Sequence, residues 1–192
     1  MAETTLDRGA AEAIAGGWHG DPFAVLGPQK QVKGWEVRAF VPGAERLWFL
    51  TGKTETEAVG YPGLPGLFTH QMARQGSYRF RAEGHGTSWD FDDPYRFGPV
   101  LGEMDEYLLG EGTHRRLWQV LGAHQIAHEG VDGVHFAVWA PNAERVSVVG
   151  DFNVWDGRRH PMRRRGATGV WEIFLPGLGE GTTYKYEIKG PG

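Results

Sequence analysis

The stretch best suited to chemistry is a short loop between Gly150 and Gly157. It places Phe152, Asn153 and Trp155 within four residues. Flat aromatic faces suit the apolar C–H faces of pyranose rings, and amide or ammonium groups suit their hydroxyl rims. The alternative is that the aromatic side chains pack within their own domain or against a neighbouring one. Residue types alone leave both interpretations open.

Two other residues, which lie later in the chain, could complete such a site. In residues 183–188, Tyr184, Tyr186 and Ile188 alternate with polar residues, which predicts a strand with one buried and one solvated face. Lys185 is then expected on the solvated face, and Trp171 could add a second aromatic face. Binding by such an open site is expected to be weak, roughly micromolar to millimolar. The predicted carbohydrate-binding residues are Trp155, Lys185, Asn153 and Trp171.

Residues that could support catalysis or metal binding are sparse. There is no nucleophile elbow, phosphate loop, zinc-helix motif or dinucleotide fingerprint. His124 and His128 are four residues apart, but residues 125–133 (QIAHEGVDG) look like a loop and no third ligand is obvious. No catalytic residue, metal site or cofactor is therefore expected.

Composition limits the class of protein and its partners. Of 192 residues, 40% are hydrophobic and 23% charged, so a packed core is expected rather than disorder, and 30 glycines suit many short strands. The net charge is −4, and the basic run at residues 158–165 has no interleaved aromatic residue. We expect no nucleic-acid partner, and a solvated face or docking surface at this run.

The absence of cysteine and the distribution of apolar residues indicate the cellular compartment of the protein. The chain has no cysteine, which excludes a disulfide framework and a zinc–thiolate site. It has no apolar run near the roughly 18 residues of a membrane span, and its first residues do not resemble a signal peptide. A cytoplasmic protein with no membrane partner is expected.

The local patterns predict mostly strands. A short helix is expected at residues 6–15, capped by Asp7 and ended by Gly16 and Gly17. A second short helix is expected at residues 103–109. Residues 51–66 are expected to be a loop, and residues 67–82 a hairpin, as are residues 162–175.

An internal repeat organises the chain. Residues 35–50 match residues 134–149, with proline on proline and Ala-Glu-Arg on Ala-Glu-Arg. This predicts an all-β protein of two tandem immunoglobulin-like β-sandwiches with a short N-terminal helix and a short helical connector. The expected limits are 1–98, a connector at 99–116, and a C-terminally truncated sandwich at 117–192. The first copy has no counterpart of GDFNVWDG, so the loop is expected to be dispensable for the fold.

Residues 133–162 (GVHFAVWAPNAERVSVVGDFNVWDGRRHPM), followed by GVWEIFLPG and YKYEIKG, strongly resemble a family-48 carbohydrate-binding module. They most resemble the module that precedes the catalytic barrel in bacterial glycogen branching enzymes. The segments DPFAVLG, DDPYRFGP and EMDEYLLGEGTHRRLWQVLGAH fit the same family. The presence of the first sandwich favours branching enzymes over debranching enzymes. The alternative interpretation is that the chain contains the equivalent module of a glycogen debranching enzyme.

The resemblance implies a parent enzyme that cuts α-1,4-glucan and rejoins the cut chain through an α-1,6 bond. Its catalytic carboxylates would lie on a barrel after residue 192, so an N-terminal fragment without branching activity is expected. The family's glycogen-binding Trp and Lys match Trp155 and Lys185. Expected partners are α-1,4-glucan or glycogen and, within the parent, the barrel. The rival interpretations are a scaffold that binds no sugar and a protein-binding module that docks on residues 158–165.

Overall fold

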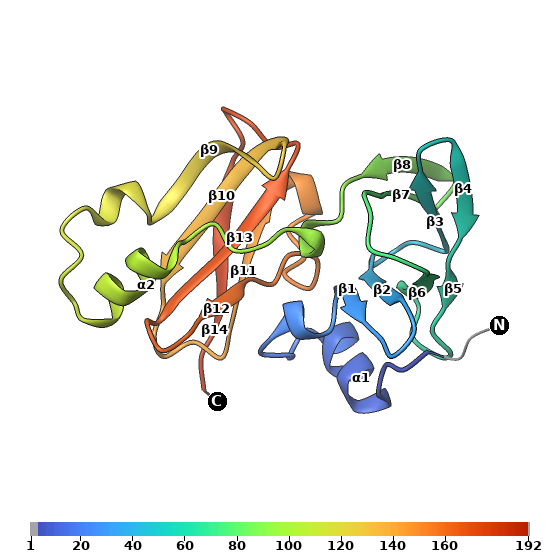
Figure 1. The fold of residues 1–192 in the computed structure, drawn as a ribbon, viewed down its shortest axis with the longest axis horizontal. Helices are drawn as coiled ribbons and strands as arrows, with labels where there is room; N and C mark the ends of the chain where they lie inside the picture. The colour runs from blue at the N-terminus through green and yellow to red at the C-terminus, as the bar shows by residue number, and fades with distance from the viewer. Residues whose placement is uncertain (1–3, 192) are drawn as a thin grey trace. The chain divides into compact units, whose positions relative to one another are not determined.

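The computed structural model describes residues 4–191, which form two compact units, one ending at Arg96 and the other beginning at Phe97 (Figure 1). Almost all regular structure is antiparallel sheet, so the predicted all-β class is confirmed. The two α-helices are α1 (Arg8–Gly16) and α2 (Glu103–Gly110), and short 3₁₀ turns are η1 (Pro22–Ala24), η2 (Pro94–Arg96), η3 (Leu117–Gln119) and η4 (Asp151–Asn153).

The predicted first helix is confirmed, although it begins at Arg8 rather than at residue 6, and the predicted cap at Asp7 and stop at Gly17 are also confirmed. The Asp7 side chain accepts a hydrogen bond from the Ala10 N–H at 3.0 Å, and Gly17 ends the helix in the left-handed conformation with φ of 72°. The buried side chains are Ala11 and Ile14, which attach this short helix to the first unit.

The first unit is a sandwich of two sheets. In the core between them, Phe49 contacts Tyr78 and Phe80 at ring-centroid distances of 5.2 and 4.9 Å. One sheet has the order β1 (Gly27–Lys30), β2 (Trp35–Phe40), β6 (Leu67–Met72), β5 (Val59–Gly60); the other has the order β4 (Thr54–Glu57), β3 (Arg46–Thr51), β7 (Arg79–Gly84), β8 (Thr87–Phe91).

Two predictions for this unit are wrong. Residues 67–82 are not a hairpin, because β6 pairs with β2 and β5 while β7 pairs with β3 and β8 in the other sheet. A period of two identifies the inward face of a strand but not its partner. Residues 51–66 are not all loop, since they contain β4 and β5. Every residue of these two edge strands is exposed, so no apolar alternation marks them.

The second unit repeats this plan, as the sequence predicts. Residues 99–116, with α2, group with it. Its larger sheet, β9-β10-β13-β12, has the same order as β1-β2-β6-β5, and β11 pairs with β14 as β3 pairs with β7 (Figure 1). The strands are β9 (Gly122–His128), β10 (Val131–Trp139), β11 (Arg145–Gly150), β12 (Arg163–Arg165), β13 (Val170–Pro176) and β14 (Tyr184–Lys189).

The hairpin predicted at residues 162–175 is confirmed by the pairing of β12 with β13. The loop predicted at residues 125–133 is wrong, since β9 and β10 form a hairpin there. Glu129 and Gly130 form its turn with φ of 49° and 81°, the left-handed pair that suits a tight hairpin.

Candidate functional site

The aromatic loop lies against β11. Where the loop ends, the Val148 N–H donates to the His160 carbonyl at 3.2 Å and the Met162 N–H donates to the Val146 carbonyl at 2.8 Å. The final residues of the loop therefore continue the sheet along the edge of β11. The preceding residues fold over the outer face of this strand.

Asn153 anchors the loop from inside. Its side chain is 1% exposed. The amide oxygen accepts from the Gly150 N–H, and the amide nitrogen donates to the Val148 carbonyl, both at 2.9 Å. The same nitrogen lies 2.9 Å from Nδ1 of His160. The amide is thus fully used in holding the loop, which gives Asn153 a structural role in this structure and no exposed surface for a sugar.

His160 supports this anchor as a neutral ring. Burial, aided by the nearby Arg159 charge, lowers the pKa of His160 to about 3. An uncharged Nδ1 can accept the hydrogen bond from the Asn153 amide at neutral pH.

The far side of the loop is held by Gly157. Its carbonyl accepts from Arg145 at 3.0 Å and from the Ser147 hydroxyl at 2.6 Å. Arg145 also pairs with the Glu187 carboxylate. A Cβ at position 157 would lie too close to that carboxylate, so a larger residue there would make the Glu187 side chain move.

Between these anchors, Trp155 points outward. Its side chain is 41% exposed, and both Val154 and Trp155 have φ of 58°. The left-handed region costs a non-glycine residue roughly 1–2 kcal/mol, so the loop holds two strained residues in succession. The Trp155 N–H donates to the Gly150 carbonyl at 3.0 Å, and the indole Nε1 donates to the Asp151 carboxylate at 2.8 Å.

Lys185 meets this ring from β14. It is exposed and pairs in register with Val149 of β11. Its Nζ lies 5.9 Å from the centroid of the Trp155 ring, at the limit of a cation–π contact. The structure thus places an aromatic face beside an ammonium group, a combination that suits the two kinds of surface on a neutral sugar.

Trp171 lies elsewhere. It is 1% exposed, and its indole N–H donates to the Ala140 carbonyl at 3.0 Å. Its ring packs between the two sheets of the second unit, where it has no free face. Of the four predicted binding residues, the structure brings Trp155 and Lys185 together at the surface and encloses Asn153 and Trp171. Asp151 is a contact that the sequence analysis missed, although it stands four residues before Trp155.

The basic run does not form one basic face. Arg158 pairs with Asp156 at 2.7 Å, and this hydrogen-bonded partner lowers the pKa of the Asp156 carboxyl. Arg163 donates to the Phe97 carbonyl at 3.1 Å, and Arg165 pairs with Glu106 at 2.7 Å. Much of the run is therefore used within the second unit, and the arginines at its end hold residues 97–106.

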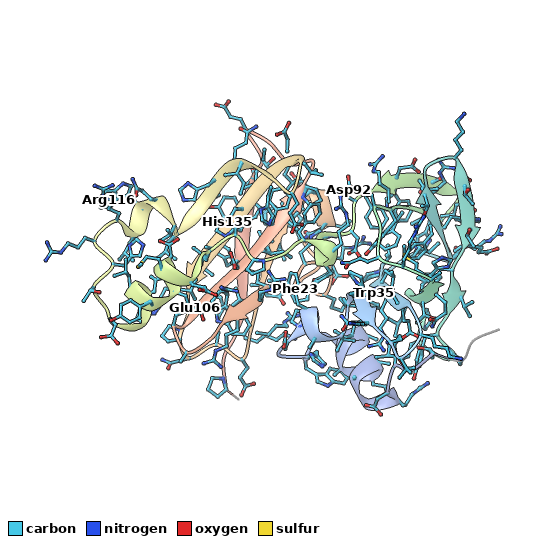
Figure 2. The ribbon with its side chains drawn as sticks, in the orientation of Figure 1. Phe23, Trp35, Asp92, Glu106, Arg116 and His135 are labelled. Atoms are coloured by element: carbon cyan, nitrogen blue, oxygen red, sulfur yellow. The ribbon has the colours of Figure 1, made fainter. Side chains whose placement is uncertain are left out.

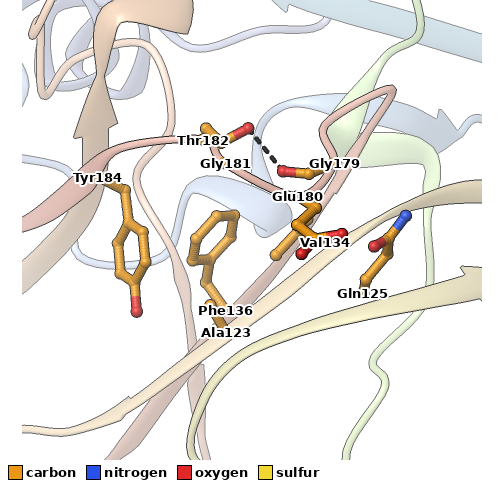
Figure 3. Close-up of a pocket in the computed structure, with 9 residues that line it drawn as sticks. All are labelled: Ala123, Gln125, Val134, Phe136, Gly179, Glu180, Gly181, Thr182 and Tyr184. Carbon is orange, nitrogen blue, oxygen red and sulfur yellow. Dashed lines mark hydrogen bonds between the residues drawn. The ribbon is translucent and has the colours of Figure 1, made fainter.

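A pocket of about 260 Å³ lies on the other side of β14 (Figure 3). The rings of Phe136 and Tyr184 form its apolar wall, with centroids 4.8 Å apart. Adjacent residues on a strand face opposite ways, so Tyr184 faces this pocket while Lys185 faces the loop. The volume falls below the usual range of small-molecule sites. The other lining residues are Ala123, Gln125, Val134, Gly179, Glu180, Gly181 and Thr182.

The histidines considered as metal ligands have other partners. Nε2 of His124 lies 2.9 Å from the Leu121 carbonyl, and Nε2 of His128 lies 2.9 Å from the Gly98 carbonyl. Within residues 4–191 no three histidine or acidic side chains gather as a metal site would require. Among the helices of this described part, none has the length and apolar character to cross a membrane.

Comparisons with known proteins identify both units. Residues 7–95 match the family described as alpha-1,4-glucan branching enzyme GlgB, N-terminal domain. Residues 120–192 match carbohydrate-binding module 48 (isoamylase N-terminal domain). A solved structure, pullulanase type I from Bacillus subtilis, covers 81% of this chain and 21% of its own at 17% identity and a TM-score of 0.32, a likeness too low to support an argument.

Curated relatives match across both units. The 1,4-alpha-glucan branching enzyme GlgB of Roseobacter denitrificans is 59% identical over 186 residues, and that of Mesorhizobium japonicum is 55% identical over 183. These alignments cover 94% and 93% of this chain but 25% of each relative, so the chain spans about a quarter of their length. The chain therefore corresponds to the N-terminal region of the GlgB family of 1,4-alpha-glucan branching enzymes, with a GlgB N-terminal domain followed by a family-48 carbohydrate-binding module.

Proposed function

We propose that the second unit binds α-1,4-glucan on the surface formed by Trp155 and Lys185. In the longer protein, this surface would hold glucan chains for an enzyme that cleaves α-1,4 bonds and rejoins the chains through α-1,6 branches. The fragment itself takes no catalytic step in this proposal. We also place the protein in the cytoplasm, where glycogen would be its substrate.

The observation that carries the proposal is an exposed indole ring held in one place. Two left-handed residues and two hydrogen bonds fix Trp155, and Lys185 Nζ lies 5.9 Å from its ring. A ring that is already ordered loses little conformational entropy when a sugar stacks on it. Strained residues that persist on a surface are often part of a function, which favours binding over a passive role.

The test is a titration of the 192-residue chain with maltoheptaose, followed by tryptophan fluorescence and NMR. We expect saturable shifts with a dissociation constant between about 1 μM and 1 mM, and a loss of at least about tenfold in affinity for Trp155→Ala. Lys185→Ala should weaken binding less, because it removes a polar contact and leaves the stacking surface.

Trp139→Ala is the matched control. Trp139 is also an exposed tryptophan of the second unit, at 62%. It ends β10 next to the turn that leads into β11, whereas Trp155 lies beyond the opposite end of β11. Its removal should leave affinity unchanged. No shifts at about 10 mM sugar would exclude affinity in this range and leave the scaffold role.

A second candidate function is support of the following domain in the parent protein. Large apolar side chains remain exposed on α2 and η3, and such groups often mark interaction surfaces. In the full-length enzyme, Tyr107→Ser with Trp118→Ser should then lower the melting temperature of the catalytic domain without weakening maltoheptaose binding by the fragment. An unchanged melting temperature would argue against this contact. The exposed residues are Met104, Tyr107, Leu117 and Trp118.

The same full-length enzyme allows a test of whether the first unit affects the length of the transferred glucan chains. We propose that it influences which chain lengths are transferred. Removal of residues 1–96 should then shift the distribution of branch lengths. An unchanged distribution would refute this role.

A further inference from the structure

The Asp151 side chain contacts the only polar atom of the exposed indole. Its Oδ1 accepts the Nε1–H of Trp155 at 2.8 Å. We propose that Asp151 is a positioning residue, which fixes the rotation of the Trp155 ring so that its face stays open to glucan. This inference rests on the proposed function of Trp155.

The backbone alone does not fix the ring. The left-handed conformation of Trp155 sets the direction of its Cα–Cβ bond, but the ring can still rotate about its two side-chain bonds. Val154, the neighbouring residue, is 74% exposed and points to solvent. Lys185 has a long flexible side chain and a contact near the distance limit. The hydrogen bond to the Asp151 carboxylate therefore supplies a directional restraint on the ring.

This hydrogen bond is of the stronger kind. An ionised acceptor makes a hydrogen bond roughly twice as strong as a neutral one. A carboxylate at the N–H edge also polarises the indole and makes the ring face more negative, which favours the sugar C–H groups and the Lys185 ammonium. Asp151 therefore acts on the sugar through Trp155, without touching it.

The Asp151 side chain can be changed without removing the backbone contacts of the loop. The hydrogen bond that closes η4 runs from the Val154 N–H to the Asp151 carbonyl, which belongs to the main chain. Asp151 is exposed, whereas the loop is anchored by the buried Asn153 and by Gly157. Loss of the carboxylate should therefore affect the ring and leave the loop in place.

A double-mutant cycle on maltoheptaose affinity tests the proposal. Trp155→Phe keeps an aromatic face but has no N–H. Asp151→Ala should weaken binding by about three- to tenfold in the wild-type background, the range of one hydrogen bond, and by less than about 1.5-fold in the Trp155→Phe background. Asp151→Asn keeps an oxygen acceptor and should lie between wild type and Asp151→Ala.

A spectroscopic signature completes the test. In the free protein, Asp151→Ala should move the Trp155 indole Hε1 resonance upfield and lower the heteronuclear NOE of this indole N–H, both of which report the lost restraint. An equal loss of affinity in both backgrounds, or an unmoved Hε1 resonance, would overturn the proposal. If the wild type binds no maltoheptaose, the proposed function fails. An immobile indole in Asp151→Ala would then refute the positioning role independently.

Discussion

The two units close the same edge of their sheets in different ways. In the first unit the chain turns after β3 and returns as β4, and the Ala58 N–H donates to the Leu47 carbonyl at 2.8 Å. In the second unit the chain leaves β11 as the aromatic loop, and the Met162 N–H donates to the Val146 carbonyl at 2.8 Å. Leu47 and Val146 occupy equivalent positions of the repeat. The same backbone hydrogen bond therefore closes the sheet edge in both units, whereas the segment that precedes this hydrogen bond differs between them.

The shared arginine shows how the second unit adapted to its loop. In the first unit Arg46 is exposed, pairs with Glu57 at 2.7 Å and lies 4.4 Å from the Trp48 ring. In the second unit the equivalent Arg145 is buried and donates to the Gly157 carbonyl. The sandwich plan does not need the aromatic loop, as the first unit demonstrates. In the second unit, however, the loop takes part in buried hydrogen bonds, such as the one from Arg145.

Each unit also has a buried carboxylate in one of its four-stranded sheets, Glu36 on β2 in the first unit and Glu172 on β13 in the second. Glu36 accepts from the Thr5 N–H at 3.2 Å and from Arg38 at 2.6 Å. Glu172 accepts from the Leu101 N–H at 3.0 Å and from His135 at 2.8 Å. Each carboxylate therefore holds the N-terminal segment of its own unit against the sheet. Figure 2 labels His135 in the second unit.

Removing these carboxylates should have the largest effect. Burial alone would raise the pKa of Glu172, but hydrogen bonds from His135 and Leu101 together with the nearby Arg165 charge outweigh it, so the pKa is lowered and the carboxylate is ionised at neutral pH. Glu172→Ala and Glu36→Ala should each lower the free energy of unfolding by about 3–5 kcal/mol, because buried donors lose their carboxylate acceptor. These donors are Arg38 and the Thr5 N–H for Glu36, and His135 and the Leu101 N–H for Glu172. Urea denaturation measures this loss.

Glutamine variants are the controls for the carboxylates. Glu172→Gln and Glu36→Gln keep the shape and one acceptor, so each should cost less than its alanine counterpart. If both alanine variants lowered the free energy of unfolding by less than about 1 kcal/mol, the buried carboxylates would contribute little to the stability of either unit.

The next largest effect is the difference in stability between a variant of the loop's buried anchor, Asn153, and a variant of its exposed ring, Trp155. Asn153→Ala leaves the Gly150 N–H and the Val148 carbonyl without their buried partner, and should cost about 2–4 kcal/mol. Trp155→Ala should cost less than about 1 kcal/mol, since the residue is 41% exposed and its removal leaves no buried polar group without a partner. Thermal and urea unfolding of both variants measure the contrast. Equal losses would mean that the Trp155 ring supports the fold.

One buried group in each unit should make stability respond to acid in opposite directions. Burial raises the pKa of Asp93 in the first unit to about 6, although Tyr78 and the Tyr95 N–H donate to it at 2.6 and 2.9 Å. The folded state then holds more protons than the unfolded state between pH 3.8 and about 6. The stability contributed by Asp93 is full below pH 3.8 and is lost as the pH rises to about 6.

His160 in the second unit has the opposite sign. Its pKa falls from 6.5 to about 3, so its contribution is full above pH 6.5 and is lost as the pH falls toward 3. Each slope should approach about 1.4 kcal/mol per pH unit within its window. Asp93→Asn and His160→Asn should each remove one slope from the pH dependence of unfolding. An NMR titration of His160 with a pKa near 6.5 would contradict the prediction.

The sequence predicted the plan of the fold better than it predicted what lies inside. The repeat and the period of two identified the sandwiches, and Lys185 was correctly placed on a solvated face. Trp155 and Trp171 could not be told apart, because β13 is covered on both faces and shows no alternation. Glu172 and Asn153 look like surface residues by type. Glu172 is buried through its pairing with His135, a residue distant in the sequence, which a local pattern does not reveal. Asn153 is buried because its side chain turns back onto nearby residues such as Val148 and His160, a conformation that residue types alone do not predict.

The smallest effect concerns the outer edge of one strand. In the first unit β7 lies between β3 and β8, whereas within residues 4–191 its counterpart β14 pairs with β11 alone. Backbone amides on an open edge are exposed to water and exchange through small local openings. The β14 amides that face away from β11 should exchange on the order of tenfold or more faster than the β7 amides that face β8.

Hydrogen exchange followed by NMR measures both sets, with the β14 amides that face β11 as the internal control. Equal protection would mean that something covers this edge in solution. Protection that rises with protein concentration would identify the cover as a second copy of the chain.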